Sequence, residues 1–150
     1  MGGPTAAAIE AGLAARVVPG RAEQERRYLK SDLHHLGVPV PAIRAAIRDA
    51  LATHPADGHD EVAALVETLW DTEPAVHERR MAAAEVLRAR VAVLGPDDLV
   101  LIERLLRTSG TWALVDAIAP WSLADLADAH PEVDAAVARW GADNDPWIRR

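Results

Sequence analysis

The feature that most constrains this chain is a set of short apolar stripes with a helical period, separated by proline and glycine. The clearest stripe runs from Val62 to Leu69 and follows the i, i+3, i+4, i+7 spacing that places its apolar side chains on one face of an α-helix. Comparable stripes occupy Ile43 to Leu51, Leu99 to Leu106 and Val133 to Trp140. The alternating pattern typical of strands is nearly absent. The pattern therefore predicts an all-α protein.

Proline and glycine mark most of the expected helix boundaries. Proline at the first helical position costs little, because its missing N–H would have no partner there in any case, and Pro41, Pro96 and Pro131 fit that position. Further boundaries are indicated by Pro19-Gly20, Gly37, Pro39, Pro55, Pro74, Gly95, Gly110, Pro120 and Gly141.

The expected helix starts recur at a regular interval. One series begins near Ala22, His59, Pro96 and Pro131, and a second begins near Pro41, Ala75, Thr111 and Trp147. Neighbours in each series lie about 36 residues apart, a period typical of an α-solenoid (α-α superhelix) of HEAT-like helical repeats. From the periodicity alone an irregular helical bundle stays open as the alternative. We expect a single repeat domain over residues 1–150, truncated at its C-terminus because no polar capping helix follows Trp147.

Composition excludes several classes of protein. The chain has no Cys, so neither a disulfide framework nor a thiolate metal site is expected. No apolar run approaches the roughly 20 residues needed to cross a bilayer. The first residues lack the basic-then-apolar layout of a signal peptide. These features predict a cytoplasmic protein.

The charge balance does not by itself indicate a nucleic-acid partner. Lys and Arg number 16 against 23 Asp and Glu, a net charge of −7, whereas non-specific DNA affinity comes mainly from cations that meet phosphates. The charges are unevenly distributed, since residues 21–30 are rich in Arg and Lys while residues 57–73 carry six carboxylates and no Lys or Arg. Whether one face of the protein is basic stays open.

The segment most suggestive of chemistry contains Trp112 and Asp116. A spacing of four residues places both side chains on one face of a helix. There an aromatic ring and a carboxylate can hold a cation, because the ring face attracts positive charge and the carboxylate supplies the counter-charge. The alternative is a core Trp112 beside a solvated Asp116.

This segment resembles a known family. Thr108 to Asp116 is similar to the Thr-x-x-x-Trp-x-x-Val-Asp signature of the AlkD-like DNA alkylation repair glycosylases, which are built from HEAT-like repeats. Three further blocks resemble the family in the same order: Tyr28 to Lys30 with Leu36 to Arg44, Leu69 to Leu87, and His130 to Arg150.

The resemblance implies a DNA glycosylase of base excision repair, a hydrolase that removes cationic purines of the 3-methyladenine and 7-methylguanine type. Asp116 and Trp112 match catalytic positions, where Asp116 would face the oxocarbenium-like sugar and Trp112 would pack on the deoxyribose. Tyr28, Lys30 and Arg150 match positions that contact the DNA or the lesion.

The resemblance also implies the partners. Double-stranded DNA containing alkylated bases would be the ligand of a monomeric, nucleoid-associated protein without a cofactor or a metal ion. Thr111 departs from the family, because many members have a second Trp directly before Trp112, and a further cleft Trp of the family falls beyond Arg150. The alternative is therefore a non-catalytic helical-repeat module that binds DNA or a protein partner.

The other aromatic and histidine residues are interpreted as structural. Trp70, Trp121, Trp140 and Trp147 are expected in the core or between repeats. A metal cluster is not expected at His54 and His59 with Asp57 and Asp60, nor at His34-His35. Arg79-Arg80 has two open interpretations, contact with phosphate or ion pairing with Glu73 or Glu78.

Overall fold

Residues 3–150 are described by a computed structural model, and they form helices joined by short turns. The helices are α1 (Pro4–Ala14), α2 (Arg21–Leu29), α3 (Val40–Thr53), α4 (His59–Trp70), α5 (His77–Ala89), α6 (Leu99–Arg107), α7 (Trp112–Ile118), α8 (Ala124–Ala129), α9 (Pro131–Trp140) and α10 (Pro146–Arg149). Two 3₁₀ turns, η1 (Val91–Val93) and η2 (Pro96–Asp98), precede α6, and a π turn, η3 (Ala119–Leu123), joins α7 to α8. Within these residues β-pairing is limited to a single isolated bridge between His34 and Val76.

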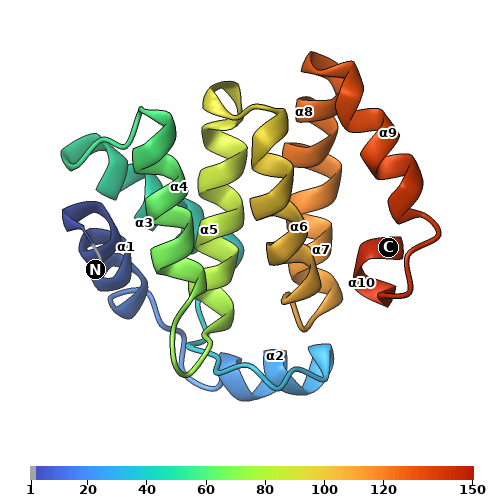
Figure 1. Cartoon of the computed structure of the whole chain (residues 1–150). Coiled ribbons are helices and arrows are strands. Elements are labelled where there is room, and N and C mark those ends of the chain that lie inside the picture. The colour runs from blue at the N-terminus through green and yellow to red at the C-terminus, as the bar shows by residue number, and fades with distance from the viewer. Residues whose placement is uncertain (1–2) are drawn as a thin grey trace.

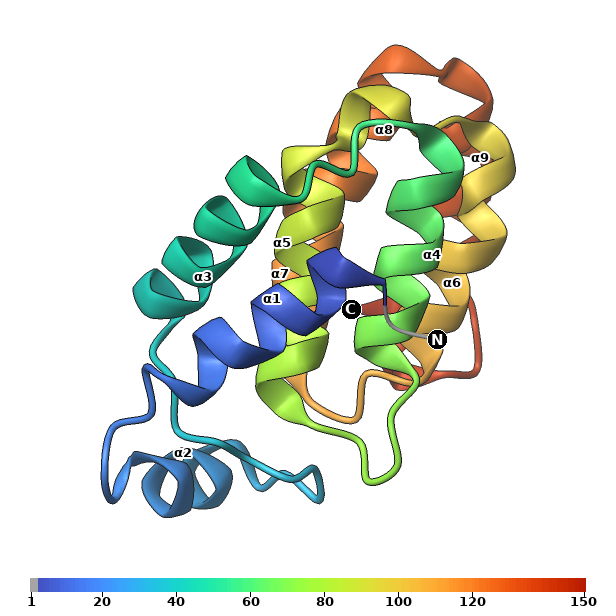
Figure 2. The same cartoon turned by 90° about the vertical axis from the view of Figure 1, so that its left-hand side faces the viewer.

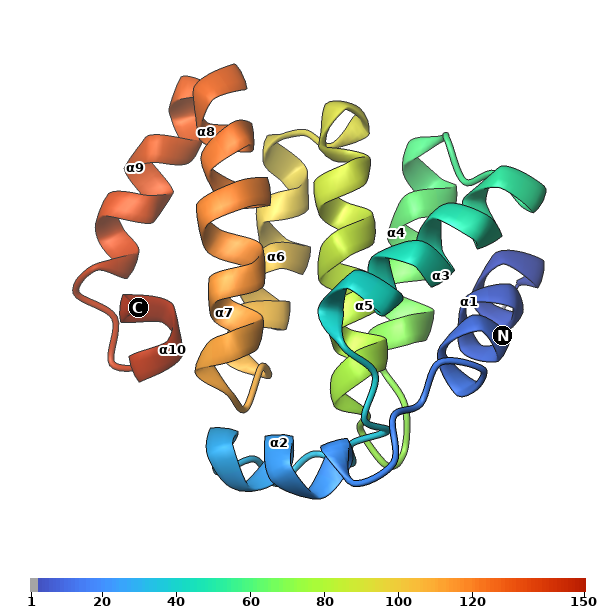
Figure 3. The same ribbon diagram turned by 180° about the vertical axis from the view of Figure 1, so that it is seen from behind.

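The helices stand side by side in two layers. Figure 1 shows α4 and α6 in the nearer layer, and Figure 3 shows α3, α5 and α7 in the layer behind them. Neighbouring helices pack in pairs, α4 on α5 and α6 on α7, and α5 also packs on α3 and α7. This arrangement confirms the prediction of an all-α helical-repeat fold.

The first pair differs from the predicted one. Helix α2 begins close to the expected residue, but α3 packs on α1, which the periodicity did not predict (Figure 2). Ile9 and Leu13 of α1 are fully buried, and Gly12 lies so close to α3 that an added Cβ would meet the Cβ of Ala46 at 2.9 Å. Helix α2 buries only Leu29 and lies across the lower ends of the other helices (Figure 1). Its sequence is too polar to form a repeat layer.

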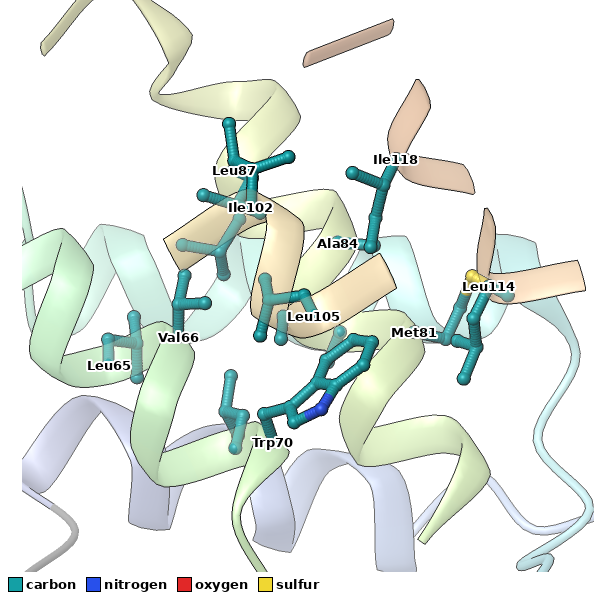
Figure 4. Close-up of a cluster of buried hydrophobic side chains, with 14 of the residues drawn as sticks. Leu65, Val66, Trp70, Met81, Ala84, Leu87, Ile102, Leu105, Leu114 and Ile118 are labelled. Carbon is teal, nitrogen blue, oxygen red and sulfur yellow. The ribbon is translucent and has the colours of Figure 1, made fainter. Parts of the chain in front are cut away.

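One hydrophobic core runs through the layers. Figure 4 shows Leu65 and Val66 of α4, Leu87 of α5 and Ile102 of α6 in one cluster. Trp70 at the end of α4 is 0% exposed, and its indole N–H donates to Thr108 Oγ1 at 2.9 Å. The expected core position of Trp70 is therefore confirmed.

Helices α7 and α8 continue into each other despite the proline between them. Pro120 was expected to end a helix, because a proline in a helix interior removes one backbone hydrogen bond and clashes with the preceding turn. The chain instead takes the wider π turn η3 at this point and remains helical from Trp112 to Ala129. Ile118 and Leu123, on either side of Pro120, are both buried.

A buried carboxylate fixes the segment that follows α2. Glu78 in the first turn of α5 is 0% exposed and accepts hydrogen bonds from the backbone N–H groups of Leu36, Gly37 and Val38, at 2.9, 2.7 and 3.2 Å. Gly37 has a φ of +87°, and a Cβ there would lie 2.9 Å from the backbone N of Ala22. The glycine and the carboxylate together dock the α2–α3 loop on α5.

We predict that Glu78→Ala lowers the free energy of unfolding by at least about 3 kcal/mol, because buried backbone donors lose a charged acceptor. Urea unfolding at neutral pH measures the effect. The matched control is Glu85→Gln on the same helix, whose carboxylate pairs with the half-exposed Arg44 at 3.1 Å and which should cost no more than about 1 kcal/mol. Equal losses in both variants would contradict the docking role of Glu78.

Candidate functional site

The site begins at the N-terminus of α7. Gly110 has a φ of +73° and turns the chain, and Thr111 caps the helix by accepting a hydrogen bond from the Ala113 N–H at 3.2 Å. Thr111 is 1% exposed, so this departure from the family pattern serves as a buried N-cap. A Thr directly before an apolar helix is a sequence signal for such a cap.

Two aromatic side chains meet at this end of the molecule. Trp112 lies in the first turn of α7 and is 37% exposed, while Tyr28 comes from α2 and is 74% exposed. Their ring centroids lie 6.1 Å apart with an angle of 77° between the planes, an edge-to-face contact. Trp112 is therefore not a core residue, and the aromatic surface is open to solvent.

Arg150 joins the aromatic pair to Asp116. Its guanidinium binds both carboxylate oxygens of Asp116, at 2.8 and 2.9 Å, and lies 5.9 Å from the centre of the Trp112 ring. The hydrogen bonds from Arg150, and then its charge, lower the pKa of Asp116 below its ordinary value. Tyr28, Trp112, Asp116 and Arg150 thus form one group, here named the aromatic–carboxylate cluster, in which the carboxylate is held ionised.

Lys30 is not joined to this cluster. It ends α2 in the left-handed conformation, with a φ of +50°, and its side chain is exposed. Within residues 3–150 no hydrogen bond or ion pair of its ammonium group is found. The structure thus brings together four of the five predicted site residues and leaves Lys30 two positions from Tyr28 on the adjoining surface.

Helix α10, which carries Arg150 at its end, is positioned by ion pairs. Arg107 of α6 binds Asp143 in the α9–α10 loop at 3.0 and 2.7 Å, and it also binds Glu103. These hydrogen bonds lower the pKa of Asp143 to about 2. Asp145 then caps α10 by accepting the Trp147 N–H at 2.8 Å. The Arg107–Asp143 contact therefore fixes α10 close enough to α7 for Arg150 to bind Asp116.

A pocket of about 650 Å³ adjoins the cluster between α7–α8 and α9–α10. Asp116 and Arg150 form part of its wall, and Val115, Leu123, Val137 and Trp140 supply an apolar part. Sequence reasoning missed this pocket, because its lining residues belong to separate apolar stripes and only the packing of the helices brings them together.

The remaining tryptophans divide between core and surface. Trp140 is 9% exposed and Trp147 packs against the core, as predicted. Trp121 lies outside the core, in η3, and is 46% exposed. It stacks under the guanidinium of Arg88 on α5, at 4.0 Å from the ring centre, so it takes the second expected position, between repeats. Because the π turn at Pro120 changes the helix register, Trp121 faces out from the core.

The polar residues left open by the sequence have structural partners. Arg79 pairs with Glu10 at 2.6 Å, and the Arg80 guanidinium lies over Trp70 at 4.9 Å. His59 contacts Asp60 at 2.8 Å and Asp98 at 2.9 Å, and these carboxylates raise its pKa. Among the described residues, the ligand-type side chains that do converge are Glu25, His35 and His77, below α5.

The fold and the site define a helical-repeat protein with an exposed aromatic pair next to an arginine-bound carboxylate. The model of the DNA alkylation repair enzyme family matches residues 9–150, nearly the whole chain. The chain belongs to the DNA alkylation repair enzyme family. No curated protein matches it.

Family membership gives the chain a role in DNA alkylation repair, supports an enzymatic role, and indicates DNA as a binding partner. In residues 3–150, no helix has the length and apolar character required to cross a membrane.

We predict that Arg150→Gln raises the pKa of Asp116 toward its ordinary value, because the carboxylate loses both hydrogen bonds and the neighbouring charge. A lowered carboxyl pKa in the folded state stabilises the fold above the unfolded-state pKa, and this contribution disappears as the pH falls through the folded-state pKa. A ¹³C-carboxyl NMR titration measures the change. Arg149→Gln is the matched control, since Arg149 bonds to the carbonyls of Asp143 and Asn144 instead. A titration of Asp116 that is the same in wild type and Arg150→Gln would contradict the assignment.

Proposed function

We propose that the protein is a DNA glycosylase that excises cationic alkylated purines of the 3-methyladenine and 7-methylguanine type. The observation that carries this proposal is the aromatic–carboxylate cluster, in which Asp116 is ionised beside the exposed ring of Trp112. This pairing suits a positively charged lesion, because both the carboxylate and the ring face attract cations.

The chemistry requires stabilisation of positive charge on the sugar. Alkylation at a ring nitrogen gives the purine a positive charge and weakens its bond to deoxyribose, so departure of the base leaves an oxocarbenium-like sugar. Glycosidases stabilise the same kind of transition state with carboxylates. In the proposed mechanism Asp116 faces the developing charge and orients the attacking water, while Trp112 packs on the deoxyribose.

Arg150 has two competing partners in this mechanism. In the structure its guanidinium occupies both oxygens of Asp116. A DNA phosphate offers the same bidentate geometry for an arginine, so phosphate binding would draw Arg150 away and free the carboxylate for the sugar. The exchange would expose the catalytic charge only when DNA is present.

The open position of the aromatic pair favours a lesion contacted from one side rather than enclosed. Tyr28 and Trp112 are 74% and 37% exposed, and their edge-to-face contact presents a step on which a nucleotide can stack. In this proposal double-stranded DNA binds a monomer along the surface that contains α2, α7 and α10, with Tyr28, Lys30 and Arg150 on the DNA or lesion.

A second candidate is a module that binds DNA or a protein partner without catalysis. The tight Arg150–Asp116 ion pair favours it, because the pair reduces the attraction of Asp116 for a cationic lesion. The net charge of −7 favours a protein partner over DNA within this candidate, because an acidic protein repels phosphates. DNA binding by the wild type without release of any base would support the binding module over the enzyme.

We predict that the wild type releases 7-methylguanine or 3-methyladenine from methylated duplex DNA and that Asp116→Asn lowers the single-turnover rate by about 100-fold or more. Chromatography of the released bases measures the rate. Asp128→Asn, which removes a carboxylate from the wall of the same pocket, is the matched control and should remain close to wild type. An unchanged rate of base release by Asp116→Asn would contradict the proposed catalytic role of Asp116.

We also predict that Trp112→Ala lowers base release about 10- to 30-fold, as expected for a cation–π contact of up to about 2 kcal/mol. Trp121→Ala is the control, because Trp121 is an exposed tryptophan in the same continuous helix and stacks on Arg88. A rate that falls equally in both variants would point to a loss of general stability instead of a specific role for Trp112.

A further inference from the structure

Helix α2 lies across the lower ends of the other helices and has few contacts that hold it there (Figure 1). It buries only Leu29, so apolar burial contributes little to its position. At its C-terminal end Tyr28 meets Trp112 edge to face, and in its middle Glu25 faces two buried histidines. A helix held in this way can open locally, because its release exposes little apolar surface.

The two histidines lie where α2 meets α5. His35 belongs to the α2–α3 loop and His77 is the first residue of α5, and their side chains are 1% and 5% exposed. The rings are stacked, with centroids 4.5 Å apart and 13° between the planes. Because the lone pairs of stacked rings lie in two parallel planes, they do not converge on a single metal ion. Nδ1 of His35 instead lies 3.2 Å from Oε1 of Glu25, within reach of a hydrogen bond.

His77 is poorly placed to carry a positive charge. An imidazolium donates from both ring nitrogens. Nδ1 of His77 is buried without a hydrogen-bond partner among the described residues, and Nε2 lies 3.5 Å from Oε1 of Glu25, which is too long for a good hydrogen bond. Protonation would therefore bury an N–H group without an acceptor, in a ring stacked on a second histidine.

We propose that His77 acts as a pH switch: while neutral it holds α2 on α5, and its protonation releases α2 together with Tyr28. In the docked state the neutral ring stacks on His35 and lies beside Glu25. In the released state water reaches the ring nitrogens and accepts the additional N–H. The two states differ in the number of protons that they bind, which is the requirement for a pH-dependent equilibrium.

The charged groups around His77 act in opposite directions. The carboxylates of Glu78 and Glu25 favour the protonated form, and Arg21 binds Glu25 at 3.1 Å and offsets part of its charge. Burial, and then the adjacent His35, outweigh both carboxylates and lower the pKa of His77 below its ordinary value of about 6.5. Docked α2 thus binds fewer protons than released α2. Docking therefore weakens by up to about tenfold for each pH unit below about 6.5, until the pH reaches the lowered pKa.

The release of α2 is local, because the segments on both sides of it have separate anchors. The His34 backbone in the following loop is bonded to the segment that begins α5, at 2.9 and 2.8 Å. In the preceding loop the Val18 N–H donates to the Gly37 carbonyl at 2.9 Å. Helix α2 can therefore turn about its ends, Gly20 and Lys30, while the layers from α3 to α7 keep their packing.

Acidification would separate Tyr28 from Trp112 and move Lys30 with it. In a DNA glycosylase that contacts its substrate through Tyr28 and Lys30, DNA binding would weaken as the pH falls below about 6.5. That consequence rests on the proposed function, whereas the release of α2 does not. A test that follows α2 without DNA therefore keeps the two proposals separate.

Tyr28 is the only tyrosine of the chain, so a ring-labelled tyrosine reports on α2 alone. NMR spectra of the full chain are recorded from about pH 7.5 to about pH 5, together with the imidazole signals of the histidines. Tyr28 is expected to lose its NOE to Trp112 at the same midpoint as the titration of His77, below about pH 6.5, while the methyl signals of the core stay unchanged. An NOE that persists over this range, or that disappears only together with the core signals, overturns the proposal.

Substitution then identifies the titrating group. His77→Gln keeps a polar side chain and His77→Phe keeps a flat ring against His35, and neither can be protonated, so Tyr28 is expected to stay docked down to about pH 5. His34→Gln, which changes an exposed neighbouring histidine, and His59→Gln, on α4, are the matched controls and should keep the wild-type transition. A transition that persists in His77→Gln or His77→Phe, or that is lost in either control, would assign the switch to another group and overturn the proposal.

Discussion

The buried carboxylate of Glu78 determines the position of the part of the molecule that apolar packing cannot fix. Helix α2 buries only Leu29, so hydrophobic burial supplies little to orient it. Three backbone N–H groups after α2 bind Glu78 instead, and the loop between them and α2 carries His35. Because α2 bears Tyr28, the contact of Tyr28 with Trp112 on α7 depends on a carboxylate located on α5. The aromatic half of the site is therefore assembled by a polar interaction far from the chemistry.

The helices that the sequence predicts well are those that bury an apolar face. The stripes from Val62 to Leu69 and from Leu99 to Leu106 lie on α4 and α6, because a local spacing of three and four residues is enough to define the buried face. Which helices pair is a non-local property. The small residues of α1 give a weak stripe, yet they allow its close approach to α3, and the polar sequence of α2 excludes it from the layers although its spacing fits the repeat.

The candidate site also combines features that local sequence predicts with features that depend on contacts between distant residues. Trp112 and Asp116 could be predicted because their four-residue spacing lies within one helix, and Tyr28 and Arg150 because of the family resemblance. The ion pair between Arg150 and Asp116, the pocket beside it and the group of Glu25, His35 and His77 could not be predicted, since each joins residues distant in sequence. The exposure of Trp121 could not be predicted for a related reason: the sequence around Pro120 gives no sign that the helix continues through a wider turn.

The π turn η3 determines how the helices that follow it, α8 to α10, are oriented relative to α7. A π turn holds one more residue than an α turn, and this extra residue accommodates Pro120 within the helix. As a result Ile118 and Leu123, five positions apart, both face the core. Removing a single residue from this turn would rotate α8 by about 100° about its axis. Leu126, which is buried, would then turn away from the core, and Ala124, Ala127 and Asp128 would leave the wall of the pocket beside Asp116. The number of residues across Pro120 thus fixes the rotation of α8 about its axis relative to α7, and with it the position of the C-terminal helices relative to Asp116.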